Sequence, residues 1–182
     1  TGYLGRVISF EPQSQSFSIL QQRAKSDENW LCIQAALGEH EGRSDLLISG
    51  RKTSSSLLPV ENAHVKAVPA SATISREIVN IHSLDFYLSK EIQPHESIFL
   101  KIDVQGYEMF VLRGAQRLLS QVKALEIELS FVPLYRDAPV FFDMMTYLEK
   151  QGFVLLSLNH VLRDPNSGQL LQVDGLLKKI NT

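Results

Sequence analysis

The amino-acid sequence predicts an α/β protein built on a mostly parallel β-sheet that ends in an antiparallel hairpin. Apolar runs of strand length alternate with segments of helical spacing, an order typical of parallel sheets with crossover helices. The clearest case is 99–115, FLKIDVQGYEMFVLRGA, where an apolar run ends at Asp103, Gly106 follows, and apolar residues then recur at helical spacing. The turn sequence DPNSG at 164–168, between two apolar runs, predicts the terminal hairpin.

The first half of the chain predicts short strands, one helix and a long loop. Serine is a favoured N-cap, so Ser14 is expected to cap a helix that reaches Ala24. The stretch 59–75 contains two prolines and no sustained period, which predicts a mobile excursion over the sheet edge. The other elements expected here are strands at 6–10, 30–35, 45–49 and 77–81, a polar loop at 52–56 and a helical turn at 83–89.

The second half of the chain predicts the central strand–turn–helix stretch and three further strands. The run 124–131, ALEIELSF, alternates apolar and acidic residues, which places Glu126 and Glu128 on one face of a strand. Pro139 begins a helix and Gly152 closes it, because proline favours the first turn and glycine the position after the last. The expected strands are 98–102, 124–131, 153–158 and 170–180.

The composition indicates a single soluble globular domain. The chain has 182 residues, of which 44% are hydrophobic and 21% charged, as is ordinary for one well-packed core. The formal net charge of -2 gives no support for a nucleic-acid partner, and no apolar run approaches the roughly 18 residues of a membrane span. With Cys32 as its one cysteine and no histidines at ligand spacing, the chain is expected to hold neither a disulfide nor a metal. We expect a cytoplasmic protein with a small-molecule partner; the oligomeric state is open.

Eight short motifs along the chain resemble those of one enzyme family. They are GRVISFEP at 5–12, AALG at 35–38, SSSLL at 54–58, SLD at 83–85, FLKIDVQGYE at 99–108, VLRGA at 111–115, ELSFVPLY at 128–135 and GQLLQVDGLL at 168–177. In this order and spacing they resemble the FkbM family of S-adenosylmethionine-dependent methyltransferases. The resemblance implies a Rossmann-like methyltransferase fold, a three-layer sandwich, with S-adenosylmethionine as cofactor. It also implies O-methylation of a hydroxylated small molecule such as a sugar or natural product.

The resemblance further implies roles for individual residues. Glu11 matches the acid that holds the ribose hydroxyls of the cofactor, a role suited to a carboxylate because it accepts two strong hydrogen bonds from a vicinal diol. Asp103 and Glu128 match acids at the ends of two strands, where either could accept a proton from a substrate hydroxyl or bind it. The implied cofactor-binding residues are Glu11, Pro12, Ala36, Leu37 and Asp103. Ala36 and Leu37 match positions where small or apolar residues touch the adenine ring. Two alternatives stay open: Glu11 could cap a helix, and Ala36 and Leu37 could serve ordinary packing.

A first strand and a glycine-rich loop are implied upstream of Thr1. Residues 1–5 lead into a strand, whereas a nucleotide-binding loop must open a helix. Residues 1–182 are therefore expected to form one methyltransferase-like domain that lacks these elements, with one strand missing between 6–10 and 98–102. We expect Glu11 and Asp103 to lie at the same edge of one sheet and to face a shared cleft.

Two functions of other classes also fit these residues. One is a non-catalytic Rossmann-like module that serves binding or assembly. The other is an NAD-dependent oxidoreductase, which shares the acid at the end of the second strand. The glycine motif upstream of the chain would separate them, because GxGxxG is typical of the oxidoreductase.

Overall fold

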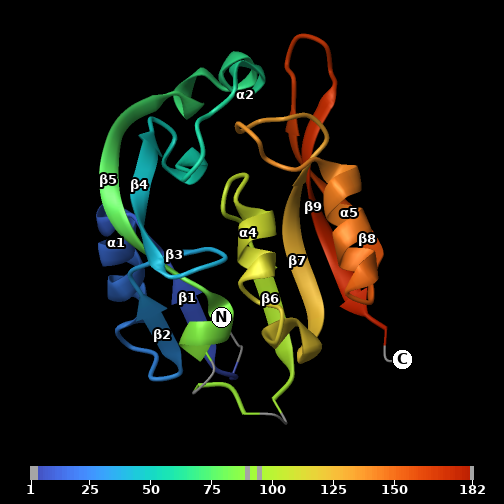
Figure 1. Ribbon diagram of the computed structural model, residues 1–182. Coiled ribbons are helices and arrows are strands. Elements are labelled where there is room, and N and C mark those ends of the chain that lie inside the picture. The colour runs from blue at the N-terminus through green and yellow to red at the C-terminus, as the bar shows by residue number, and fades with distance from the viewer. Residues whose placement is uncertain (1–3, 89–90, 94–95, 181–182) are drawn as a thin grey trace.

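The computed structural model describes residues 4–88, 91–93 and 96–180 as an α/β fold (Figure 1). The strands are β1 (Val7–Phe10), β2 (Trp30–Ile33), β3 (Ala36–Leu37), β4 (Gly42–Ser49), β5 (Thr73–His82), β6 (Ile98–Ile102), β7 (Val122–Ser130), β8 (Phe153–Arg163) and β9 (Leu170–Lys179). The α-helices are α1 (Ser14–Ala24), α2 (Asn62–Ala67), α3 (Leu84–Tyr87), α4 (Glu108–Arg113) and α5 (Phe141–Lys150). Short 3₁₀ turns are η1 (Lys52–Ser54), η2 (Pro69–Ser71) and η4 (Leu118–Ser120).

The described strands form three sheets, with the orders β1-β2, β3-β5-β4 and β6-β7-β9-β8. The pairs β1-β2, β3-β5 and β6-β7 are parallel, whereas β4-β5, β7-β9 and β8-β9 are antiparallel. The antiparallel C-terminal hairpin is therefore confirmed, but the sheets do not confirm the expected mostly parallel sheet. Strand direction depends on the path of the connections, and the long connection from β4 to β5 brings the chain back antiparallel.

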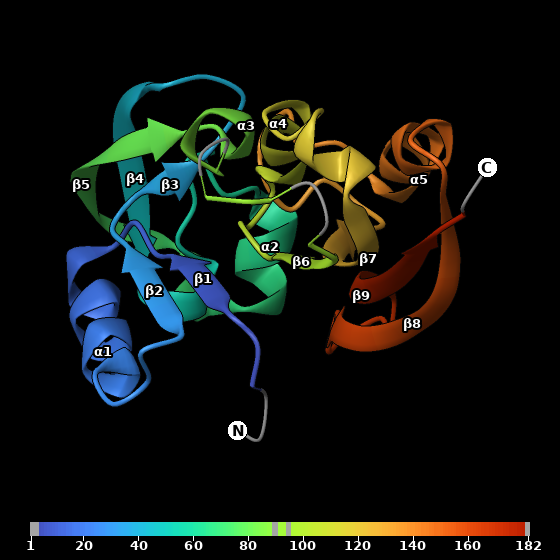
Figure 2. The ribbon, with the colours of Figure 1, turned by 90° about the horizontal axis from the view of Figure 1, so that it is seen from below.

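The main core lies on one face of the four-stranded sheet, where α4 and α5 cover it (Figure 2). Ile127 of β7, Leu112 of α4 and Leu148 of α5 are fully buried there. Ile8 and Phe10 of β1 pack against the same cluster from the two-stranded sheet. The two-stranded and four-stranded sheets therefore bury apolar side chains in the same core. Burial of apolar surface is the main favourable contribution to folding, so this core holds the two sheets together.

The strands that precede Glu11 and Asp103 belong to different sheets. β1 pairs with β2, and β6 pairs with β7. Among the described strands, no backbone pairing joins β1 to β6. The two acids therefore do not end strands of one sheet among the described strands, contrary to the expected single sheet edge. The absence of direct pairing between β1 and β6 is, however, what the expected missing strand between 6–10 and 98–102 predicts, because each of the two keeps an edge that no described strand covers.

Two local expectations also need correction. The stretch 59–75, expected to be a mobile excursion over the sheet edge, contains regular elements, namely α2, η2 and the beginning of β5. Its residue His64 is only 2% exposed and packs edge-on against Tyr135 at 5.2 Å between ring centroids. A helix of six residues is too short to show a helical period in sequence. At α1 the N-cap is Gln13, so Ser14 is the first helical residue rather than the cap.

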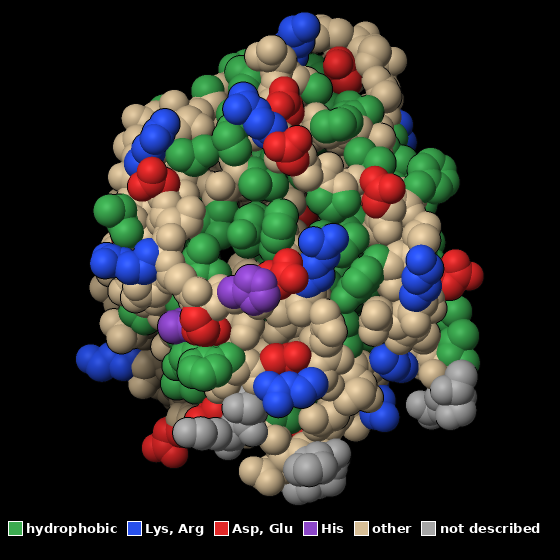
Figure 3. All heavy atoms as spheres, viewed as in Figure 1, with side chains coloured by type: hydrophobic (Ala, Val, Ile, Leu, Met, Phe, Trp, Pro, Cys, Tyr) green, Lys and Arg blue, Asp and Glu red, His purple; other side chains and the backbone are tan. Residues whose placement is uncertain are grey.

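The surface seen from the side of Figure 1 mixes both signs of charge. Figure 3 shows acidic and basic side chains interspersed over this face, with hydrophobic side chains gathered between them near its centre. None of the helices built from the described residues is long and apolar enough to cross a membrane.

Candidate functional site

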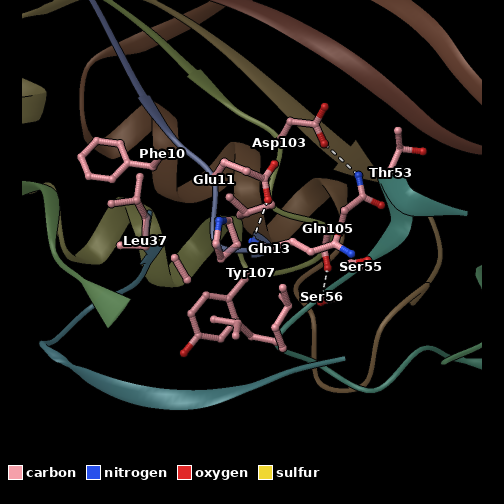
Figure 4. A pocket seen from close by; sticks show the side chains of 16 residues that line it. Phe10, Glu11, Gln13, Leu37, Thr53, Ser55, Ser56, Asp103, Gln105 and Tyr107 are labelled. Atoms are coloured by element: carbon pink, nitrogen blue, oxygen red, sulfur yellow. Dashed lines mark hydrogen bonds between the residues drawn. The ribbon is translucent and has the colours of Figure 1, made fainter. Parts of the chain in front are cut away.

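A cavity of about 240 Å³ lies beyond the carboxyl ends of β1 and β6, next to β3 and the loop that follows η1. All the residues expected to bind a cofactor line it: Glu11, Pro12, Ala36, Leu37 and Asp103. Glu11 and Asp103 thus face one cavity although they follow strands of different sheets (Figure 4). Within the described residues, no group of three or more histidine, cysteine or acidic side chains is placed to hold a metal ion.

Glu11 provides a carboxylate on one side of this cavity. Its Oε1 accepts a hydrogen bond from the backbone amide of Gln13 at 2.9 Å, which fixes the side chain next to the N-terminus of α1 (Figure 4). Its Oε2 accepts no hydrogen bond from the part of the chain that the structure describes. Burial raises the pKa of Glu11, and the nearby charge of Glu77 adds to the rise. One carboxylate oxygen is therefore available to a bound hydroxyl.

An apolar wall adjoins Glu11. Phe10, Ala36 and Leu37 line it, and Tyr107 closes it from below in the view of Figure 4. The ring of Tyr107 stacks on Phe110, with 4.2 Å between centroids and 19° between planes. Stacking fixes the orientation of the Tyr107 ring, so the wall is suited to a flat, weakly polar group.

Asp103 provides the second carboxylate and is exposed on the cavity. Its Oδ1 accepts a hydrogen bond from Nε2 of Gln105 at 2.8 Å (Figure 4). The same nitrogen donates to Oε2 of Glu128, also at 2.8 Å. Gln105 therefore bridges the two acids that the sequence proposes as catalytic residues. Sequence reasoning missed this residue, although a polar side chain between the acid and the glycine of DVQG is a usable signal.

Glu128 lies behind Gln105 and does not line the cavity. Its side chain is buried, with 8% of the residue exposed. Burial, and then the charges of Asp103 and Glu108, raise the pKa of Glu128 to about 9. Glu128 therefore carries a proton at neutral pH, and in that state it cannot accept one.

The loop that carries Asp103 is held from inside the protein by Glu108, the first residue of α4. The Glu108 carboxylate accepts hydrogen bonds from the backbone amides of Val104 at 3.2 Å and Gly106 at 3.1 Å. Burial raises the pKa of Glu108 to about 7 despite these bonds. Gly106 has a φ of +94°, and a Cβ there would lie 2.7 Å from the ring of Tyr135. Both the backbone conformation and the close packing require glycine at this position.

The fold and the cavity together indicate an α/β protein that binds a small molecule. Two carboxylates and an apolar wall lie where strands end, which is the usual place for a small-molecule site in such folds. The chain belongs to the FkbM methyltransferase family, because the model of the methyltransferase FkbM domain matches residues 1–155.

A solved structure supports the assignment of the fold. The crystal structure of methyltransferase FkbM from Methylobacillus flagellatus KT is similar, with a TM-score of 0.52 and 17% sequence identity. The similarity covers 93% of this chain but only 36% of that chain, so the present chain spans little more than a third of the length of its relative. A comparison with curated proteins finds no match.

Proposed function

We propose that this chain forms the cofactor and acceptor site of an S-adenosylmethionine-dependent O-methyltransferase. The observation that carries the proposal is the single cavity that brings together Glu11, an apolar wall and Asp103. Membership of the FkbM methyltransferase family supports it. The order of the strands also supports a Rossmann-like methyltransferase sheet, if one further strand joins β1 to β6.

The residues of the cavity fit the proposed cofactor. Glu11 has a carboxylate oxygen available to a ribose diol, and charged acceptors make strong hydrogen bonds to hydroxyls. Ala36 and Leu37, with the fixed ring of Tyr107, would enclose the adenine ring. Pro12 follows Glu11 on the same wall. The bound cofactor supplies a methyl group on a sulfonium, whose neutral thioether is a good leaving group.

The chain itself would supply the positioning of the acceptor and the removal of its proton. Asp103 is the proposed base, because it is exposed on the cavity. Among the described residues, Gln105 bonds to its Oδ1, and its other oxygen, Oδ2, can face the acceptor. When the acceptor oxygen takes the methyl group, its hydroxyl proton would pass to Asp103. Glu128 stays the second candidate, and it would first have to lose the proton that its surroundings stabilise. Positioning of two reactants can supply on the order of 7–11 kcal/mol of a barrier.

The proposed acceptor is a hydroxylated small molecule such as a sugar or natural product. The polar side of the cavity supports this class, because Thr53 and Ser55 bring hydroxyl groups to the cavity that Asp103 also lines (Figure 4). Such groups are suited to hydrogen bonds with several acceptor hydroxyls, which would hold one of them in line with the methyl group.

The test combines binding and transfer. Calorimetry with S-adenosylmethionine and with NAD separates a methyltransferase from an oxidoreductase, and label transfer from methyl-labelled S-adenosylmethionine to a panel of sugars and polyols detects catalysis. Asp103→Asn should lower turnover far more than it lowers cofactor affinity, because it removes the base and keeps the shape. Binding without transfer to any acceptor would favour the non-catalytic binding module, and binding of NAD alone would favour the oxidoreductase.

A further inference from the structure

Every polar group of the Gln105 side chain has a partner inside the protein. The two hydrogens of Nε2 go to Oδ1 of Asp103 and Oε2 of Glu128, each at 2.8 Å. Oε1 accepts a hydrogen bond from the hydroxyl of Tyr135 at 2.8 Å. The backbone carbonyl of the same residue accepts one from Oγ of Ser56 at 2.6 Å. Three partners thus hold the side-chain amide and a fourth holds the backbone, and only 9% of the residue is exposed.

The backbone of Gln105 adopts a conformation that glutamine rarely takes. Its φ is +56°, in the left-handed region. Such a conformation is unfavourable for a residue with a Cβ and persists only where the surrounding structure enforces it. The bonds of Glu108 to Val104 and Gly106, on either side of Gln105, provide that constraint. The left-handed turn is what points the amide back between the two carboxyl groups.

Tyr135 decides which end of the amide faces the acids. Its hydroxyl lies 2.8 Å from Oε1 of Gln105 and 3.2 Å from the backbone carbonyl of Ser54. Donation of its one hydrogen to the nearer acceptor, Oε1, places the amide nitrogen toward Asp103 and Glu128. Burial raises the pKa of Tyr135 well above its ordinary value, so the hydroxyl stays a donor at any pH at which the protein would work.

We propose that Gln105 is a positioning residue for the methyl-transfer reaction: its amide holds Asp103 on the cavity wall and separates it from Glu128, so that Asp103 alone presents an oxygen to the acceptor hydroxyl. This inference rests on the proposed function of the cavity. Without the amide, two neighbouring carboxyl groups are free to share one proton, as paired carboxyls do. Asp103 would then no longer be held apart from Glu128 at the acceptor.

Two variants test the role of Gln105. Gln105→Gly keeps the left-handed turn, since glycine adopts it freely, and removes the amide. Tyr135→Phe keeps Gln105 and removes the hydroxyl that orients its amide. It therefore still tests the role of the amide if the glycine variant fails to fold. Asp137→Gly is the matched control, because Asp137 is the other described non-glycine residue with a positive φ, at +59°, and is exposed.

The expected result is a selective loss of turnover. In Gln105→Gly, kcat falls by about ten- to a hundredfold, in line with the loss of a hydrogen bond to a charged group, whereas affinity for S-adenosylmethionine stays within about twofold. The acid limb of the pH–rate profile moves to higher pH, because the lost donor favoured the charged carboxylate. Tyr135→Phe changes kcat and the profile in the same direction, and Asp137→Gly behaves as wild type. Unchanged kcat and pH profile in both test variants would overturn the inference.

A second readout separates this inference from the proposed function. In carbon-13 NMR of labelled glutamate carboxyls, loss of the amide in Gln105→Gly should move the titration of Glu128 above its wild-type midpoint. If the wild-type protein transfers no methyl group to any acceptor, the proposed function fails, and this titration alone decides whether Gln105 holds the two acids. An unchanged Glu128 midpoint would then show that it does not.

Discussion

Glu77 on β5 caps helix α1 from a different sheet by accepting hydrogen bonds from Ser14. The carboxylate of Glu77 receives the backbone amide of Ser14 at 3.2 Å and also its hydroxyl. The side chain of the N-cap residue Gln13 caps no backbone amide of the helix and instead accepts a bond from the hydroxyl of Ser16 at 3.1 Å. A carboxylate at this position satisfies an amide that the helix leaves unpaired and lies at the positive end of its dipole. The contact therefore joins the three-stranded sheet to the helix that begins beside Glu11.

Replacing Glu77 by alanine should destabilise the protein. We expect Glu77→Ala to lower the free energy of unfolding by about 1–2 kcal/mol, the usual effect of losing a helix cap. Urea denaturation followed by circular dichroism measures it. Arg76→Ala on the same strand is the control, because the ion pair of Arg76 with Asp45 is exposed and such pairs contribute little. Equal effects in the two variants would contradict the capping role.

Glu11→Gln should weaken binding of S-adenosylmethionine by roughly tenfold to a hundredfold. The change keeps the shape and one acceptor oxygen but removes a charge, and hydrogen bonds to charged groups contribute about 1.5–3 kcal/mol. Calorimetric titration measures the affinity, with Glu149→Gln, an exposed acid outside the cavity, as control. If the folded Glu11 variant binds S-adenosylmethionine as tightly as wild type, Glu11 does not bind the cofactor, and its hydrogen bond to Gln13 has a structural role alone.

Gly106→Ala should destabilise the protein far more than Gly168→Ala. Both glycines have positive φ values, +94° and +72°, so both substitutions carry the backbone penalty of roughly 1–2 kcal/mol. Only at Gly106 does the new Cβ also meet a buried ring, that of Tyr135, whereas nothing lies within 4 Å at Gly168. Thermal unfolding of the two variants measures the difference. Similar melting temperatures would mean that the loop can move away from Tyr135.

Glu128→Gln should become more stable relative to wild type as the pH rises. The pKa of Glu128 is raised from 4.5 to about 9, so the folded protein keeps a proton that the unfolded chain releases. The contribution of this group to stability is therefore complete below about pH 4.5 and is lost as the pH rises toward 9. Glutamine cannot ionise and can still accept the bond from Gln105.

Melting temperatures of wild type and Glu128→Gln at pH 5 and pH 8.5 test this prediction. The difference between the two proteins should favour the variant more at the higher pH. Other buried acids such as Glu108 are present in both proteins, so their titration largely cancels. A difference that does not change with pH would show that Glu128 ionises normally in the folded state.

The local sequence pattern predicted the central strand, turn and helix, and the family resemblance predicted five of the residues that line the cavity. The run that ends at Asp103, the glycine at Gly106 and the helix after it are found where the pattern predicted them. The residues proposed to bind the cofactor, from Glu11 to Asp103, do line one cavity. These features are predictable because each depends on a short stretch of chain: an apolar run makes a strand, and polar residues just past its end lie at the edge of a sheet.

The pairing of the strands and the raised pKa of Glu128 depend on the tertiary structure. The direction of β4 against β5, and the separation of β1 from β6, depend on how distant segments pack. Gln105 bonds to residues 23, 30 and 49 positions away, namely Glu128, Tyr135 and Ser56. Burial, and then the charges of Asp103 and Glu108, raise the pKa of Glu128. Hydrogen bonds and burial between residues so far apart depend on the folded arrangement, and no local pattern in the chain specifies them.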